Sequence, residues 1–266
     1  MILFKRSYSK LRNCPTPDPG GEAEHIRAGE EAGEKTPFFL LILAFALFYY
    51  GSTAPVAAES TDDLIIEHGR RDSREIAITF DACPTTLPDE YDEKVIEILL
   101  HEKTPATLFL SGRWVEKNQE KVKFLASQPQ FEIANHSFWH PHLLEKDDDR
   151  ILRELKRTQA IIKKVAGGTP RYFRPPFGEV DERVAKLASK AGLVTIQYDI
   201  ASGDPDEGLS PQRIVRSVLR DAKGGSIIVF HMNRKGVHTA EILPDIIDGL
   251  RKKGFTLVTV GELLKK

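Results

Sequence analysis

The chain has 266 residues, of which 41% are hydrophobic and 29% are charged. This length and composition predict one globular domain of roughly 200 residues with a buried core, plus an additional N-terminal segment. The 38 Lys and Arg residues nearly balance the 39 Asp and Glu residues, and no basic run interleaved with aromatic residues follows residue 60. These features argue against a nucleic-acid-binding protein and favour a neutral polymer or a small molecule as the partner.

The N-terminal segment carries an apolar stretch typical of an export signal. Residues 37–50 are continuously apolar (PFFLLILAFALFYY), and Val56 and Ala58 follow at the two small-residue positions expected before a cleavage site. We therefore predict a signal peptide at residues 37–58, with an uncleaved membrane anchor as the alternative. Residues 1–36 lack apolar periodicity and are predicted to be a disordered extension. With either a signal peptide or an anchor, we expect the domain to be exported to the periplasm, the cell envelope or the medium. Contact with a membrane is predicted only through the anchor.

The following domain, residues 64–266, alternates short β-branched or aromatic runs with longer helical patterns. This alternation is typical of repeated βα units around a parallel sheet. About seven strands favour an α/β fold with a (β/α) barrel one unit short of the eightfold form, and an open doubly wound sheet is the alternative. The predicted strands are residues 76–81, 106–111, 131–136, 171–175, 193–199, 226–231 and 256–260, and the predicted helices are residues 92–102, 148–165, 211–224 and 242–253.

Polar side chains occur where these predicted strands end. They are Asp81, Ser111, Asn135, His136, Arg174, Tyr198, Asp199 and His231. Strands that are buried on both faces are normally apolar throughout, so their polar ends require a common reason. Because the loops after the carboxyl ends of parallel strands build the active site, we predict that these side chains line one pocket.

Three of these positions, with one neighbour, indicate metal-assisted hydrolysis. His136 and His140 have the spacing of two imidazoles that converge on one divalent metal ion, with surface or core histidines as the alternative. Asp81 is a candidate metal ligand or a base toward water, and its structural alternative is an N-cap. His231 ends an apolar run, where partial burial suits a general acid and where a hydrogen-bonded core histidine is the alternative.

Two charged residues are candidates for holding this machinery in place. Arg174 is followed by two prolines and is suited to an ion pair with Asp81 or Asp204, while a solvated arginine is the alternative. Asp204 lies in an SGDP sequence, and its carboxylate is suited to orienting His231. The alternative is that SGDP is an ordinary turn sequence.

Two aromatic positions are candidates for contact with substrate. Phe177 and the adjacent Gly178 are candidates to present a backbone amide to a developing oxyanion. Trp139 is either a stacking wall for a sugar ring or a packed loop aromatic.

Five short motifs follow one another along residues 70–262. They are TFDAC at 79–83, HSFWH at 136–140, RPPFG at 174–178, DIASGDP at 199–205 and VFH at 229–231. In these motifs the chain resembles the polysaccharide deacetylases of carbohydrate esterase family four, the NodB-homology domain. The resemblance implies a distorted seven-stranded (β/α) barrel that hydrolyses the N-acetyl amide of a sugar, with water activated by a divalent metal ion, for which zinc is expected. The roles it implies are base (Asp81), metal ligands (His136 and His140), brace of the base (Arg174), carboxylate that tunes the acid (Asp204), acid (His231) and oxyanion-hole amide (Phe177).

Two positions depart from the family pattern. Ala82 replaces a second aspartate that ligates the metal, and alanine offers no ligand atom. Three arrangements stay open: Asp81 joins both histidines at the metal and leaves the base role unfilled, Cys83 joins them as a thiolate, or the site holds no metal. Pro205 replaces a tryptophan that commonly lines the substrate groove, so an altered saccharide subsite is expected.

The sequence therefore predicts a metal-dependent hydrolase that removes N-acetyl groups from a polysaccharide. The candidate polymers are peptidoglycan, a chitin-like glycan and an exopolysaccharide of N-acetylglucosamine. One alternative is a metal-free amidohydrolase acting on another carbon–nitrogen bond, and a second is an inactive envelope protein that binds glycan. The charged residues of the site favour an enzyme, because a binding protein has no evident need for buried charges there.

Overall fold

The computed structural model describes residues 64–84, 91–233 and 235–265. The predicted disordered extension (residues 1–36) and the predicted signal peptide or anchor (residues 37–58) lie outside the described residues. Across the described segments, the structure has no helix long and apolar enough to span a membrane.

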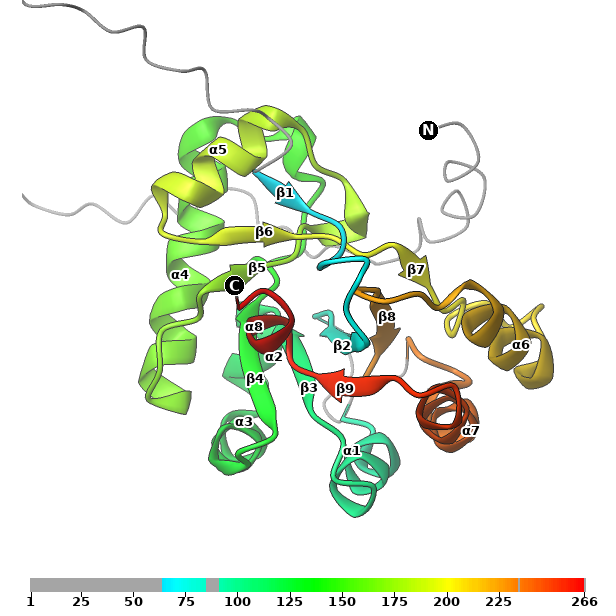
Figure 1. Ribbon diagram of the computed structural model, residues 1–266. Coiled ribbons are helices and arrows are strands. Elements are labelled where there is room, and N and C mark those ends of the chain that lie inside the picture. Colours follow the sequence, from blue (N-terminus) through cyan, green and yellow to red (C-terminus); the bar gives the residue numbers. More distant parts are fainter. Residues whose placement is uncertain (1–63, 85–90, 234, 266) are drawn as a thin grey trace, which may run out of the picture. The chain divides into compact units, whose positions relative to one another are not determined.

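In this part of the chain, nine strands form one sheet whose neighbouring strands run parallel (Figure 1). All seven predicted strands are present, although several are shorter than predicted. The two additional strands, β1 and β7, have two residues each, as does the predicted β5. The strands are β1 (Ile65–Ile66), β2 (Glu75–Ala82), β3 (Ala106–Leu110), β4 (Phe131–Asn135), β5 (Tyr172–Phe173), β6 (Val194–Ile196), β7 (Ile200–Ala201), β8 (Ile227–His231) and β9 (Thr256–Val258).

The sheet curls into a distorted barrel. Its order is β1-β6-β5-β4-β3-β2-β8-β7, and β9 pairs with the beginning of β2. Residues 197–199 join β6 to β7, yet β6 pairs with β5 while β7 pairs with β8 at the other end of the order. Because this short connection links the second strand of the order to the last one, the sheet turns back on itself. The predicted distorted barrel is confirmed, with two strands more than predicted.

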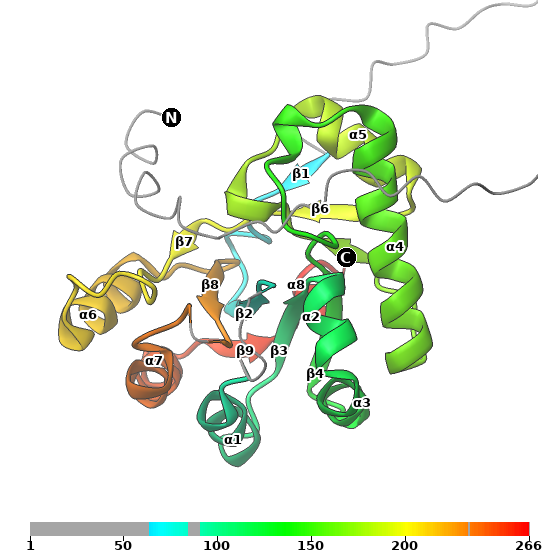
Figure 2. The ribbon, with the colours of Figure 1, turned by 180° about the vertical axis from the view of Figure 1, so that it is seen from behind.

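The longer helices pack around the outside of the barrel (Figures 1 and 2). The four predicted helices correspond to α1, α4, α6 and α7. Side chains of Asp92, Asp147 and Ser210 cap the first turns of α1, α4 and α6, and Gly167 ends α4 in the left-handed conformation. The helices are α1 (Glu93–His101), α2 (Gly112–Lys117), α3 (Gln119–Ser127), α4 (Asp148–Ala166), α5 (Glu182–Lys190), α6 (Pro211–Asp221), α7 (Thr239–Lys252) and α8 (Val260–Leu263).

The alternation of side chains along β2 separates two cores. Ile76, Ile78 and Phe80 belong to the large cluster between the sheet and the outer helices. Ala77 belongs to a second cluster of residues inside the barrel. Because side chains alternate across a strand, Asp81 points to the same inner side as Ala77. The fold thus carries a charged residue at the end of a buried strand.

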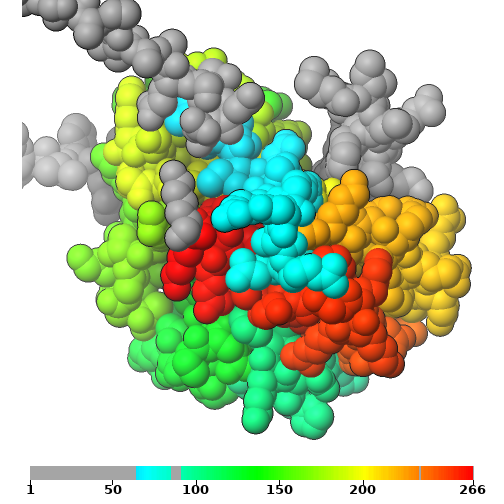
Figure 3. Space-filling model, viewed as in Figure 1, coloured from blue at the N-terminus to red at the C-terminus, as the bar shows by residue number. Residues whose placement is uncertain are grey.

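Helix α8 closes the barrel at the amino ends of the strands. Thr259 and Glu262 form a capping box at its start, and its apolar residues join the inner cluster. In the space-filling view (Figure 3), this C-terminal segment and the segment that leads into β2 cover the centre of the barrel. The amino ends of the strands are thus covered, and Asp81 and His231 lie at the opposite end.

Glu132 is a partly buried carboxyl group at the end of the barrel that α8 covers. It accepts hydrogen bonds from the Thr107 hydroxyl (2.7 Å) and the Gly261 amide (3.0 Å). Burial raises the pKa of Glu132 above its ordinary value, and these two bonds offset only part of that effect. A carboxyl group whose pKa rises on folding stabilises the fold below its unfolded pKa, and that contribution is lost as the pH rises through the folded pKa.

We expect Glu132→Gln to remove the loss of stability at high pH, because glutamine stays neutral. Its side-chain oxygen can still accept the hydrogen bonds from Thr107 and Gly261. At about pH 8 the variant should melt about 2–4 °C above the wild type, which corresponds to about 1 kcal/mol for a domain of this size. At about pH 4, where both side chains are neutral, the two melting temperatures should converge. Thermal unfolding across this pH range tests the prediction, and a difference that does not change with pH would contradict it.

Candidate active site

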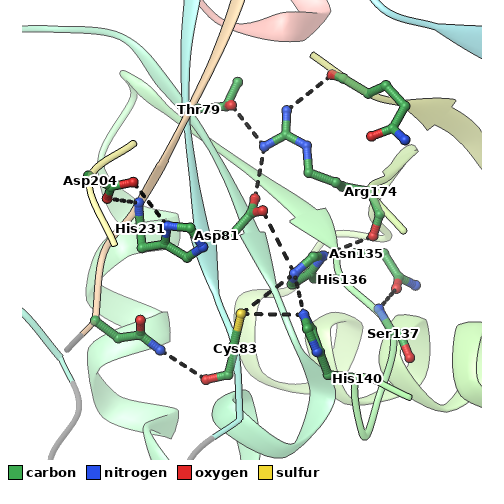
Figure 4. Close-up of polar contacts among 12 residues, drawn as sticks. Thr79, Asp81, Cys83, Asn135, His136, Ser137, His140, Arg174, Asp204 and His231 are labelled. Atoms are coloured by element: carbon green, nitrogen blue, oxygen red, sulfur yellow. Dashed lines mark hydrogen bonds and ion pairs between the residues drawn. The ribbon is translucent and has the colours of Figure 1, made fainter. Parts of the chain in front are cut away.

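The carboxyl ends of β2 and β8 bring Asp81 and His231 together. The two residues are partners in the parallel register of these strands. The loops that follow β4, β5 and β7 add His136, Arg174 and Asp204 to the same end of the barrel (Figure 4). These five side chains therefore lie together at one end of the barrel, and four of them, all but Asp204, were predicted from the polar strand ends.

Arg174 holds Asp81 inside the barrel. Its Nη1 donates to Asp81 Oδ1 (2.8 Å) and to the Thr79 hydroxyl (2.8 Å), and its guanidinium lies over the Phe109 ring. Arg174 and Asp81 are both buried, with 1% and 6% of their surface exposed. Burial raises the pKa of Asp81, but Arg174, His136 and His231 together more than offset it, so that the pKa of Asp81 lies below its ordinary value. Of the two partners predicted for Arg174, the structure selects Asp81, which is ionised at neutral pH.

Asp204 holds His231. Its carboxylate accepts hydrogen bonds from His231 Nδ1 (3.1 Å), the His231 amide (2.8 Å) and the Thr239 hydroxyl (2.6 Å). Since a carboxylate can only accept, His231 carries a proton on Nδ1. Gly236 allows this packing, because a Cβ there would lie 2.0 Å from the Thr239 hydroxyl and 2.7 Å from Asp204.

Next to Asp81, three buried side chains point toward one another (Figure 4). The Nε2 atoms of His136 and His140 are 3.1 Å apart, and Cys83 Sγ lies 3.8 Å from the first and 3.4 Å from the second. The donor atoms of these three residues all lie within 4.8 Å of one another. Asp81 is farther away, with Oδ2 3.8 Å from His136 Nε2.

His136 is oriented by its second ring nitrogen, whereas His140 Nδ1 is buried without a hydrogen-bond partner among the described residues. His136 Nδ1 lies 2.9 Å from the Arg174 carbonyl, an acceptor, so the proton is on Nδ1 and the lone pair of Nε2 faces the cluster. Burial lowers the pKa of His136 despite the opposing Asp81 carboxylate, and burial together with His136 lowers the pKa of His140 well below its ordinary value. The two rings are therefore neutral, which is the form that binds metal.

The donor spacing fits zinc. Tetrahedral bonds of about 2.05 Å to nitrogen and 2.3 Å to sulfur require separations of about 3.3 Å between nitrogens and about 3.6 Å between nitrogen and sulfur. The three observed separations differ from these values by about 0.2 Å each. Three protein ligands leave a fourth position open, as in catalytic rather than structural zinc sites.

A buried carboxylate shapes the loop that carries both histidines. Glu154 Oε2, on α4, accepts hydrogen bonds from the Ser137 hydroxyl (2.8 Å) and from the amides of Phe138 (2.8 Å) and Trp139 (2.7 Å). Within this loop, Ser137 and His140 have φ angles of 64° and 60°, a left-handed conformation that costs energy for residues with a Cβ. Glu154 thus stabilises the strained backbone that brings His140 back toward His136.

We expect Glu154→Gln to weaken metal binding by about 10–100-fold, the usual cost of losing a group that orients a ligand. Losing bonds to a charged acceptor should also lower the free energy of unfolding by about 2 kcal/mol. Competition with a chromophoric chelator and denaturant unfolding measure the two effects. Glu120→Gln, at an exposed glutamate on α3, is the matched control. Unchanged metal affinity in Glu154→Gln would contradict the assigned role.

The two aromatic candidates have different surroundings. The ring of Phe177 contacts His140 edge-on (4.5 Å between centroids) and stacks on His142 (4.1 Å). Its φ of 59° is left-handed, so the local backbone turns sharply beside the cluster. Trp139 instead packs on Phe138, with Arg113 and Arg157 over its ring. The structure thus brings Phe177 to the site, whereas the contacts of Trp139 are with its own loop, α2 and α4.

Three other predicted rim residues have structural contacts, whereas Ser111 occupies the N-cap position of α2 without a side-chain hydrogen bond. Asn135 bonds the backbone of Ser137 and Leu155. Asp199 accepts from Ser226 and pairs with an arginine, and the ring of Tyr198 lies under the Arg174 guanidinium.

Sequence reasoning missed Glu154, and it left Cys83 as one of several open possibilities. A signal for Glu154 was present, since it shares the buried face of α4 with Ile151, Leu155 and Thr158. A carboxylate on an apolar helix face needs partners, and here those partners are in the loop that carries His136 and His140.

Comparison with known proteins agrees with this geometry. The sequence model of the polysaccharide deacetylase family matches residues 68–196. A peptidoglycan-N-acetylglucosamine deacetylase of Bacillus cereus is 30% identical over 200 residues, covering 74% of this chain and 70% of the relative. The chain belongs to the polysaccharide deacetylase family. The resemblance read from the five motifs is thereby confirmed.

Solved structures of this family have the same fold. The crystal structure of the Bc1960 peptidoglycan N-acetylglucosamine deacetylase superposes with a TM-score of 0.70 at 28% identity, over 76% of this chain and 94% of that chain. BA3943 of Bacillus anthracis, described as a carbohydrate esterase family four pseudoenzyme, superposes with a TM-score of 0.69 at 27% identity, over 76% and 69% of the two chains. A mutant of BA3943 is described as having restored enzymatic activity. Catalytic and non-catalytic members therefore share this fold, and the chemistry of the individual site must distinguish them.

Proposed function

We propose that this protein is a metal-dependent hydrolase that removes N-acetyl groups from a polysaccharide built on N-acetylglucosamine. The observation that carries the proposal is the pair of Asp81 and His231 on adjacent strands, each held by its own charged partner, next to a buried cluster of metal-binding atoms. Peptidoglycan, chitin-like glycans and exopolysaccharides all contain the required acetamide. The relatives named as peptidoglycan deacetylases favour peptidoglycan among these polymers.

In the proposed reaction Asp81 is the base. A zinc ion held by His136 and His140, with a third ligand, would act as a Lewis acid toward the acetyl carbonyl. Asp81 accepts the proton of the attacking water as the new carbon–oxygen bond forms. Arg174 keeps Asp81 ionised and fixed while the proton moves.

His231 is the acid in the second half of the reaction. Its Nε2 gives a proton to the departing nitrogen as the carbon–nitrogen bond breaks, leaving acetate and a free sugar amine. Asp204 keeps Nδ1 protonated and stabilises the charged ring. The amide of Phe177 is proposed as a donor to the developing oxyanion, and Trp139 as a wall of the saccharide groove.

Two observations favour a different function, that of a glycan-binding protein without catalysis. Ala82 lacks a ligand atom, and a structurally similar family member is described as a pseudoenzyme. Against this reading stand Arg174 and Asp204, which are both buried and both paired with a candidate catalytic residue. Maintaining buried ion pairs costs desolvation energy that glycan binding alone does not require.

We also propose that the domain works outside the cytoplasm, exported by residues 37–58 as a signal peptide or an anchor. Several relatives are named for action on peptidoglycan, a substrate of the cell envelope.

Release of acetate tests the proposed function. The purified full-length chain should release acetate and free amino groups in equal amounts from at least one of peptidoglycan, chitooligosaccharides and poly-N-acetylglucosamine. His231→Gln should lower acetate release by about 10²–10⁴-fold, the contribution of a general acid, while glycan affinity is retained. His101→Gln, at an exposed histidine on α1, is the control. Glycan binding without acetate release would contradict the proposal and favour the binding protein.

A further inference from the structure

We propose that the thiolate of Cys83 is the third metal ligand of this site. It would take the place of the carboxylate that Ala82 does not provide. This inference rests on the proposed function only for the catalytic use of the metal ion. Metal binding by Cys83 can be tested without any substrate.

The direction of the side chains at the end of β2 supports this assignment. Ala82 is fully buried in the outer cluster, among residues that face the surrounding helices. Asp81 faces the interior, and alternation along the chain turns Cys83 to that side as well. Figure 4 shows the Cys83 sulfur pointing at both histidines. In this backbone, residue 83 is therefore better placed to face His136 and His140 than residue 82.

The backbone around Cys83 is fixed before any metal binds. The carbonyls of residues 81–83 each accept a hydrogen bond, in turn from the Met232 amide (3.2 Å), the Ser111 amide (3.1 Å) and the Asn233 side chain (3.0 Å). Asn233 is fully buried. Because three bonds from two neighbouring loops hold this segment, the sulfur position does not depend on a flexible loop.

Asp81 is a poorer third ligand than Cys83. Its Oδ1 is engaged by Arg174, and its Oδ2 lies 3.8 Å from His136 Nε2 but outside the group whose donor atoms are mutually within 4.8 Å. Cys83 Sγ, by contrast, has both nitrogens at the spacing that tetrahedral zinc requires. A thiolate at the metal therefore leaves Asp81 available as the base and resolves the conflict created by Ala82.

A sulfur ligand also predicts which metal the site prefers. Thiolates favour zinc and similar soft or borderline ions, whereas carboxylate and water ligands suit magnesium, calcium and manganese. We therefore expect zinc, cobalt and cadmium to bind, and manganese and magnesium to compete poorly.

Cobalt(II) substitution of the full-length chain tests the proposal directly. A cobalt ion bound by thiolate shows an intense near-ultraviolet charge-transfer band, which nitrogen and oxygen ligands do not give. The wild type should bind one cobalt per chain and show this band. Cys14→Ser, which removes the other cysteine of the chain, should behave identically and is the matched control. Cys83→Ser should lose the band and bind cobalt more than about 100-fold more weakly, exceeding the usual cost of losing an orienting group.

Cys83→Asp supplies a second, conservative test. Its carboxylate should restore cobalt binding without restoring the band, which would show that the position, and not merely a thiol, serves as ligand. Circular dichroism of the metal-free variants checks that each one folds. If Cys83→Ser loses its fold, protection of wild-type Cys83 from iodoacetamide by stoichiometric zinc decides the question, with unprotected alkylation overturning the proposal.

The outcomes separate this inference from the proposed function. No cobalt binding, or binding without the band in the wild type, overturns Cys83 as a ligand even if the chain releases acetate. A Cys83-dependent band in a chain that releases no acetate from any glycan upholds the metal site and contradicts the deacetylase.

Discussion

Asp81→Asn should lower kcat/KM for acetate release by about 10³-fold while the chain still binds metal with nearly wild-type affinity. Asparagine preserves the shape of the side chain and an acceptor for Arg174, but it cannot take a proton from water. Because Cys83, His136 and His140 are the proposed ligands, the loss should appear in turnover and not in metal content. Steady-state kinetics and metal analysis of the same preparation measure both quantities.

The alternative role of Asp81 gives the opposite pattern. If Asp81 were the third ligand, Asp81→Asn would lose metal affinity together with activity, and added zinc would recover part of the rate. Asp248→Asn, at an exposed aspartate on α7 that pairs with Lys252, is the control for changes in charge alone. Full activity of Asp81→Asn would contradict its assignment as the base.

Arg174→Met should destabilise the fold by about 3–5 kcal/mol, because it leaves the Asp81 carboxylate buried without its partner. The pKa of Asp81 is lowered in the folded protein, so its ionisation stabilises the fold above its unfolded pKa, and this contribution is lost as the pH falls through the folded pKa. In Arg174→Met the pKa of Asp81 should rise, because burial is then no longer offset by the guanidinium. The ionised carboxylate should then destabilise the fold at neutral pH. Denaturant unfolding at several pH values measures this change.

Arg174→Met should also move the acidic limb of the pH profile of kcat/KM to higher pH. The base must be deprotonated to act, and its deprotonated form becomes scarcer when its pKa rises. Arg174→Lys, which keeps the charge but not the planar fork, should lie between the wild type and Arg174→Met in both stability and pH profile. Arg171→Met, at an exposed arginine three residues earlier, is the matched control. An unchanged acidic limb in a folded Arg174→Met variant would show that Arg174 does not set the pKa of Asp81.

Much of the fold was predictable because its signals are local. Strands β2, β3, β4 and β8 have five or more residues and show a pattern in the sequence, whereas β1 and β7 are defined by long-range pairing with β6 and β8. Closure of the barrel likewise depends on the connection between β6 and β7, which no local pattern reveals. Helices α2 and α8 have only six and four residues, and α3 carries a weak apolar face. Helix α5 has a clear apolar face that sequence reasoning missed.

The members of the site were more predictable than its internal contacts. Polar residues at strand ends identified Asp81, His136 and His231, because parallel strands bring their carboxyl ends to one place. Whether Arg174 contacts Asp81 or Asp204 depends on three-dimensional placement, as does the approach of Cys83 to His140. The buried Glu154 shows the limit most clearly, since its partners are backbone amides from a different part of the chain.

Metal-dependent deacetylation is tested by acetate release from the full-length chain before chelation, after chelation and after stoichiometric zinc is restored. We predict that acetate release from an N-acetylated glycan falls to background when the metal is removed and returns when one zinc ion per chain is added back. Acetate release that does not change after complete metal removal would contradict a metal-dependent hydrolase and would favour a metal-free amidohydrolase.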